Sequence, residues 1–184
     1  MWAFLARRIL QLGGWTISSG APDVPKAVII AAPHTSNWDG FWAMTYIVAV
    51  GLDVKFFAKR SLFWFPLGNV LRLLGGVPLD RIRAGSAVNQ AVELFEQNDS
   101  FYFGLAPEGT RANVPCWKSG FYRIAVAANV PVVPGFLDFG TRRIGLGEPV
   151  TLSGDQDADL VVFRALYKDV RGRHPEKTGT ISFQ

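Results

Sequence analysis

Two patterns of hydrophobic and polar positions alternate along the 184 residues. Short apolar runs rich in β-branched residues, such as AVIIAA at 27–32, predict buried strands. Between these runs, apolar residues recur at helical spacing, most clearly over 84–97. There, the apolar positions that share one face of the helix are Val88, Ala91, Leu94 and Phe95.

The pattern predicts six strands and six helices in alternation. The predicted strands are 27–32, 54–59, 75–81, 100–106, 130–139 and 142–150. The predicted helices are 2–14, 39–50, 66–74, 84–97, 119–129 and 156–170. This alternation favours an α/β fold in which helices flank a largely parallel central sheet. The length suits a single domain over 1–184.

The first predicted helix has two interpretations. Its apolar side chains share one face, with two arginines and a glutamine off that face. Residues 1–15 would then form an interfacial helix on a membrane surface. The alternative is a helix packed on its own domain. The apolar residues are Trp2, Leu5, Ile9 and Leu12.

Composition excludes several classes of protein. Charged residues make up 18% of the chain, and no low-complexity tract indicates disorder. Cys116 is the only cysteine, so no disulfide forms within the chain, and we interpret it as a structural thiol. Two histidines and one cysteine, far apart in sequence, match no zinc spacing, so we expect no metal site.

Charge and hydropathy indicate an anionic partner and contact with a membrane surface. The net charge is +4, which fits a phosphate-bearing substrate, a lipid surface or nucleic acid. The basic residues stand singly at predicted strand ends rather than in an extended track, so we expect no nucleic acid. The mean hydropathy of +0.18 is high. However, no run reaches the roughly 18 to 20 apolar residues that span a bilayer.

Polar residues follow three predicted strands. His34 follows 27–32, Asp80 and Arg81 end 75–81, and Glu108–Arg111 follows 100–106. In parallel sheets, binding sites collect outside the carboxyl ends of the strands. We therefore predict the functional site at this edge of the sheet.

The pair His34 and Asp39 has a catalytic and a structural interpretation. Residues five apart cannot meet on a regular helix. If His34 lies in the turn before the helix, Asp39 can fold back, fix the imidazole tautomer and leave the other nitrogen as a general base. The alternative is a histidine that caps the helix beside an aspartate that favours its positive end. No G-x-S-x-G elbow is present, and Cys116 has no evident base, so any activated hydroxyl belongs to a substrate.

The PEGTR turn over 107–111 is suited to an anion. Gly109 permits close approach of a ligand, and Arg111 offers a planar set of donors for phosphate. The alternative is an ordinary turn with a surface ion pair. Lys59 and Arg81, at other strand ends, are weak signals alone.

Together these segments resemble a known family. PHTSNWD at 33–39, GVPLDR at 76–81, APEGTR at 106–111 and VPVVPG at 130–135 resemble, in order, the four sequence blocks of the glycerolipid acyltransferases. That family includes the 1-acylglycerol-3-phosphate acyltransferases. The resemblance implies a fold like that of the glycerophosphate acyltransferases.

The resemblance also implies a mechanism. His34 would take the proton from an acceptor hydroxyl, and Asp39 would orient His34. The acyl donor would be a thioester on coenzyme A or acyl carrier protein, so neither an enzyme nucleophile nor a cofactor is expected. Phosphate-binding side chains map onto Lys59, Arg81 and Arg111.

Further roles follow from the same resemblance. Glu108, Gly109 and Thr110 would shape the acceptor site, and the apolar segment 61–74 would line an acyl-chain tunnel or belong to the core. The default acceptor is 1-acylglycerol-3-phosphate. Other lysolipids or aminolipids are alternatives, as are a thioesterase or a lipid-binding module without turnover. The expected location is peripheral, on the cytoplasmic face of the cell membrane. We assign no role to His174, in a C-terminal segment expected to be mobile.

Overall fold

The structure is a computed structural model that describes residues 1–79 and 87–183. The described residues form a seven-stranded sheet in the order β1-β7-β6-β2-β5-β3-β4. Every neighbouring pair is parallel except β6 and β7, which are antiparallel. The strands are β1 Thr16–Ile17, β2 Lys26–Ala32, β3 Val54–Lys59, β4 Gly76–Leu79, β5 Phe101–Leu105, β6 Val132–Asp138 and β7 Arg143–Leu146.

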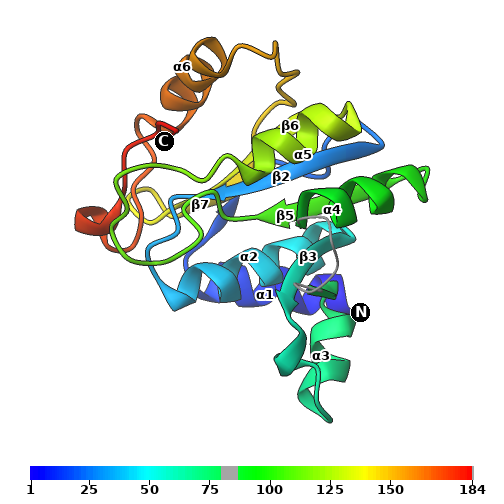
Figure 1. Ribbon diagram of the computed structural model, residues 1–184. Coiled ribbons are helices and arrows are strands. Elements are labelled where there is room, and N and C mark those ends of the chain that lie inside the picture. Colours follow the sequence, from blue (N-terminus) through cyan, green and yellow to red (C-terminus); the bar gives the residue numbers. More distant parts are fainter. Residues whose placement is uncertain (80–86, 184) are drawn as a thin grey trace.

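Helices cover both faces of this sheet (Figure 1). α1 and α2 lie on one face, and α4 and α5 lie on the other. α6 packs on the same side as α5, where Phe163 contacts Phe121. The helices are α1 Trp2–Leu12, α2 Asn37–Val50, α3 Leu67–Leu73, α4 Ala87–Glu96, α5 Gly120–Ala128 and α6 Gln156–Tyr167, with 3-10 turns η1 Arg60–Leu62 and η2 Pro175–Lys177. The predicted α/β fold with a largely parallel sheet is confirmed.

β2 lies at the centre of the sheet, between β5 and β6. Its side chains are buried on both faces, which explains why its sequence is a continuous apolar run rather than an alternating one. Val28 and Ile30 pack in the core beneath α4, α5 and α6. Ala27 and Ile29 belong to a second cluster on the α2 side. Because β2 ends at Ala32, the turn that contains His34 lies at the carboxyl edge of the sheet.

The structure differs from the prediction at several boundaries. β1 was missed because two residues, Thr16–Ile17, carry no periodic pattern. α2 begins at Asn37 rather than at 39, because Ser36 caps it. The last helix ends at Tyr167 rather than at 170. The final residues of the predicted strand 75–81 lie outside the described residues.

α1 combines features of both interpretations of the first helix. Ala6 and Leu10 are buried in a cluster shared with α2, as expected for a helix packed on its own domain. The opposite side exposes large apolar residues, among them Phe4 and Leu12. Among the described residues, no helix has the length and apolar character needed to cross a membrane.

Candidate active site

His34 and Asp39 meet through a helix cap. β2 ends at Ala32, and α2 begins at Asn37 with Ser36 as its N-cap. Asp39, in the first turn, folds back, and its Oδ2 accepts the backbone N–H groups of Thr35 at 2.7 Å and Ser36 at 2.8 Å. The same oxygen lies 3.4 Å from His34 Nδ1. The capping box therefore brings Asp39 back to His34, although the two residues are five positions apart, and the Asp39 carboxylate orients the imidazole.

The His34 side chain is 21% exposed and lies on the wall of a large cavity. The cavity has a volume of about 830 Å³, within the range of small-molecule sites. Most of its wall is apolar and comes from α2, α3 and strands of the sheet. Representative apolar lining residues are Ala43, Ile47, Phe56, Leu71, Leu74 and Phe136.

The segment 61–74 contributes to this cavity only in part. Leu71 and Leu74 line it, whereas Trp64, Phe65 and Leu73 are exposed to solvent. The cavity extends to the charged turn after β5, since Gly109, Thr110 and Arg111 also line it. An apolar chain and an anionic head can therefore occupy one continuous space that includes His34.

Glu108 lies beneath the His34 turn and does not line the cavity. It is 1% exposed, and both carboxylate oxygens lie 3.1 Å from the backbone nitrogen of His34, which donates to them. Burial raises the pKa of the Glu108 carboxyl above its usual 4.5, and the His34 N–H bond partly offsets that rise. Burial, and to a smaller extent the charge of Glu108, raise the pKa of Tyr167 well above its ordinary value.

Gly109 has a φ of 66°, a left-handed conformation that glycine adopts without strain. The Lys118 side chain lies against it so closely that a Cβ at position 109 would stand 2.8 Å from Nζ. The loop folds back here, because the Lys118 N–H donates to the carbonyl of Pro107. The sequence does not predict a role for Lys118, because its contact with Gly109 depends on the fold of the intervening loop and not on a local pattern.

The predicted site residues are brought together only in part. His34, Asp39, Gly109, Thr110 and Arg111 border one cavity, and Glu108 lies buried behind it. Lys59 is exposed at the end of β3 and is not among the residues that line the cavity. Arg81 lies outside the described residues.

The segment around His174 packs on the site, in contrast to the mobile segment that the sequence suggests. The His174 N–H donates to Thr35 Oγ1 at 3.1 Å, next to the candidate base. The Arg173 guanidinium lies over the ring of Trp38, 5.7 Å from its centroid. The Asn113 amide donates to the carbonyl of Glu176, which ties this segment to the loop after β5. These contacts join parts of the chain that are more than 60 residues apart, so no local pattern predicts them.

Metal and thiol chemistry have no structural support among residues 1–79 and 87–183. No group of three or more His, Cys, Asp or Glu side chains there could hold a metal ion. Cys116 is a free, half-buried thiol.

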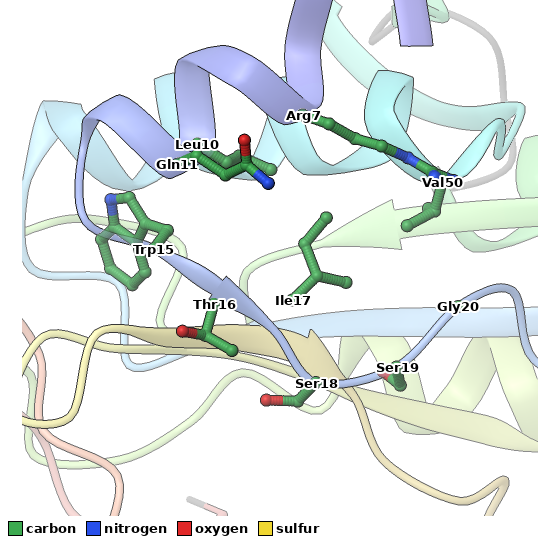
Figure 2. Close-up of a pocket in the computed structure, with 10 residues that line it drawn as sticks. All are labelled: Arg7, Leu10, Gln11, Trp15, Thr16, Ile17, Ser18, Ser19, Gly20 and Val50. Atoms are coloured by element: carbon green, nitrogen blue, oxygen red, sulfur yellow. The ribbon is translucent and has the colours of Figure 1, made fainter. Parts of the chain in front are cut away.

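A second cavity, of about 540 Å³, lies between α1 and β1 (Figure 2). Gln11 and Arg7 of α1 line one side, and Thr16 and Ser18 line the other. The Arg7 guanidinium donates to the carbonyl of Ala49. None of the predicted site residues lines this cavity, so the candidate active site is the larger one.

Comparison with known proteins identifies the family. The sequence profile described as Acyltransferase matches residues 18–137, which include His34, Asp39 and Glu108–Arg111. The chain therefore belongs to the acyltransferase family. The C-terminal segment that contacts Thr35 lies outside the matched range.

Relatives similar in sequence to this chain are named 1-acyl-sn-glycerol-3-phosphate acyltransferases. The chain is 29% identical over 141 residues to the chloroplastic 1-acyl-sn-glycerol-3-phosphate acyltransferase BAT2 of Brassica napus, covering 73% of this chain and 40% of that protein. It is 29% identical over 126 residues to the 1-acyl-sn-glycerol-3-phosphate acyltransferase of Escherichia coli, covering 64% and 49%. It thus spans less than half the length of these relatives.

A solved structure supports the fold. The crystal structure of the 1-acyl-sn-glycerophosphate acyltransferase PlsC from Thermotoga maritima matches with a TM-score of 0.65. The match covers 91% of this chain and 76% of that one at 23% sequence identity. The similarity therefore extends over nearly the whole sheet and its helices.

Proposed function

We propose that the protein transfers a fatty acyl group from a thioester to the hydroxyl of a lysolipid, with 1-acylglycerol-3-phosphate as the first candidate acceptor. The observation that carries the proposal is the His34–Asp39 pair on the wall of a large apolar cavity. Family membership and the names of the relatives support it.

The geometry suggests how the side chains would act. Asp39 faces Nδ1 of His34, so Nε2 is the nitrogen left to accept the proton of an acceptor hydroxyl. The hydroxyl oxygen then attacks the thioester carbonyl and forms a tetrahedral intermediate. When this collapses, the carbon–sulfur bond breaks and the imidazolium gives its proton to the departing thiolate, which leaves as the thiol. Asp39 stabilises the imidazolium while it exists.

The donor is already activated, so the proposed reaction needs neither an enzyme nucleophile nor a cofactor. Coenzyme A and acyl carrier protein are the two proposed carriers of the thioester. We assign the acceptor phosphate to the turn that holds Arg111, with Lys118 beside Gly109 as an additional cation. Lys59, at the end of β3, and Arg81 remain proposed phosphate ligands.

The acyl chain is assigned to the apolar part of the cavity, which predicts a change in chain-length preference. Ala43 of α2 lines the cavity, and Ala43→Phe would fill part of it. We expect kcat/KM for palmitoyl thioesters to fall about tenfold or more, while octanoyl thioesters are affected less. Ala127→Phe, at an exposed position on α5, is the matched control and leaves both values unchanged. An equal loss for both chain lengths in Ala43→Phe would contradict the assignment.

We further propose that the protein lies peripherally on the cytoplasmic face of the cell membrane. α1 and the segment 60–73 contain arginines but no acidic residue, a charge that suits anionic lipid. Both expose apolar side chains that suit an interfacial position. These exposed residues are Trp2, Phe4, Leu5, Leu12, Leu62, Trp64, Phe65, Val70 and Leu73.

Placing one negative charge among these exposed apolar residues tests the membrane proposal. Leu73, on α3, is 87% exposed. Leu73→Glu should weaken cosedimentation with phosphatidylglycerol-containing vesicles about tenfold, because burial of a leucine is worth about 1.5–3 kcal/mol. Val161→Glu, at an exposed position on α6, is the matched control. Equal binding by both variants and the wild type would count against this surface.

The test of the proposed function is thiol release from palmitoyl-CoA and from palmitoyl-acyl carrier protein, with and without a panel of lysolipids. Release that depends on a lysolipid, with the diacyl product identified by mass spectrometry, supports acyl transfer and names the acceptor. Release at the same rate without any lysolipid would indicate a thioesterase. No release from either donor by folded protein would favour a lipid-binding module.

A further inference from the structure

Glu108 is a buried carboxylate whose contacts are directed at the candidate base rather than at the cavity. Its two oxygens both accept the backbone N–H of His34, and it is 1% exposed. The neighbouring Gly109, Thr110 and Arg111 line the cavity, whereas Glu108 does not. A substrate in the cavity can therefore reach the turn without touching the Glu108 side chain.

We infer that Glu108 is a positioning residue for His34: it fixes the backbone of the His34 turn and its negative charge stabilises the protonated imidazole. The inference rests on the proposed role of His34 as general base. It replaces the acceptor-site role that the sequence resemblance implies for Glu108. Two carboxylates then act on one histidine, Asp39 at the ring and Glu108 at the backbone.

Electrostatics agree with this geometry. The charges of His34 and Glu108 attract one another, and the Asp39 charge opposes ionisation of Glu108. A carboxylate in this position lowers the free energy of a nearby imidazolium more than that of neutral imidazole. The titratable and charged groups around the pair are Asp39, Arg111, Lys118, Tyr167 and His174.

Burial of Glu108 also has a consequence for stability. Because its pKa is raised in the fold, the protonated form favours folding, and this contribution is lost as the pH rises from 4.5 through the raised pKa. Glu108→Gln removes the buried charge. We therefore expect its unfolding midpoint at neutral pH to equal or exceed that of the wild type, so lost activity would not reflect unfolding.

The first test needs no turnover. The protein has only two histidines, so an NMR titration of the ring resonances separates His34 from His174. In Glu108→Gln we expect the midpoint of the His34 titration to move to lower pH, because an anion that stabilises the imidazolium is gone. The His174 midpoint is the internal control and should stay in place. Glu108→Asp keeps the charge and should return the His34 midpoint toward that of the wild type.

The second test is the pH profile of acyl transfer. In Glu108→Gln we expect kcat to fall about tenfold to a hundredfold, with the KM for the lysolipid nearly unchanged. The acidic side of the pH profile of kcat should move to lower pH. An unmoved His34 titration in both Glu108 variants would overturn the inference. A raised KM with unchanged kcat would also overturn it and restore the role of substrate ligand. An inactive wild type would refute the proposed function, while the titration would still decide the role of Glu108.

Discussion

His34→Gln is expected to lower kcat for acyl transfer by about 10²–10⁴-fold, the usual contribution of a general base. Glutamine approximates the size of histidine but cannot take up a proton at neutral pH. The backbone N–H of residue 34 still reaches Glu108, so the turn retains its anchor. The thermal unfolding midpoint should therefore stay close to that of the wild type. Initial rates at saturating donor and acceptor measure the effect.

The chain offers a matched control for this change. His174 is the other histidine, and it contacts the site through its backbone N–H to Thr35 rather than through its ring. His174→Gln should therefore keep nearly full activity. Equal loss in the two variants, or full activity in His34→Gln, would contradict the assignment of the base.

Asp39→Asn is expected to produce the second-largest loss, about 10²–10³-fold in kcat, because a neutral amide no longer stabilises the imidazolium. The asparagine oxygen can still accept from Thr35 and Ser36, as Oδ2 does in the wild type. Its amide nitrogen would replace Oδ1, which is buried without a hydrogen-bond partner among the described residues. We therefore expect the helix cap to survive, at a cost of less than about 1 kcal/mol.

Two comparisons separate the effect of Asp39 on the orientation of His34 from its effect on the stability of the fold. Asp39→Ala leaves the Ser36 cap but removes the acceptor of the Thr35 and Ser36 N–H groups, and it should lower the free energy of unfolding by about 1–3 kcal/mol. The double variant His34→Gln/Asp39→Asn should be no slower than His34→Gln alone, because the two residues act as a unit. Additive losses in the double variant would show that Asp39 acts independently of the histidine.

The central strands and the position of the site could be predicted from the sequence. β2 is an apolar run rich in β-branched residues and β6 is largely apolar, and burial on both faces is the reason why neither alternates with polar residues. His34 directly follows the apolar run 27–32, and because ligands collect at the carboxyl edge of a parallel sheet, the sequence predicts the site there. The capping box also has a sequence signature, Ser36-x-x-Asp39, which explains how a five-residue spacing brings the two side chains together.

The parts that could not be predicted depend on contacts distant in sequence. Lys118 reaches Gly109 because a loop turns back on itself. His174 reaches Thr35 across more than 130 residues, from a segment with no periodic pattern. The burial of Glu108 follows from packing under the His34 turn, whereas a charged residue in a turn of unknown fold is ordinarily expected to face solvent.

The most direct test of the account is formation of phosphatidate from palmitoyl-CoA and 1-acylglycerol-3-phosphate, followed by mass spectrometry for the wild type and His34→Gln side by side. The account predicts acceptor-dependent product with the wild type and a loss of at least about a hundredfold with the variant, in protein that remains folded. Product formed by His34→Gln at the rate of the wild type would contradict the account, because acyl transfer would then proceed without the proposed base.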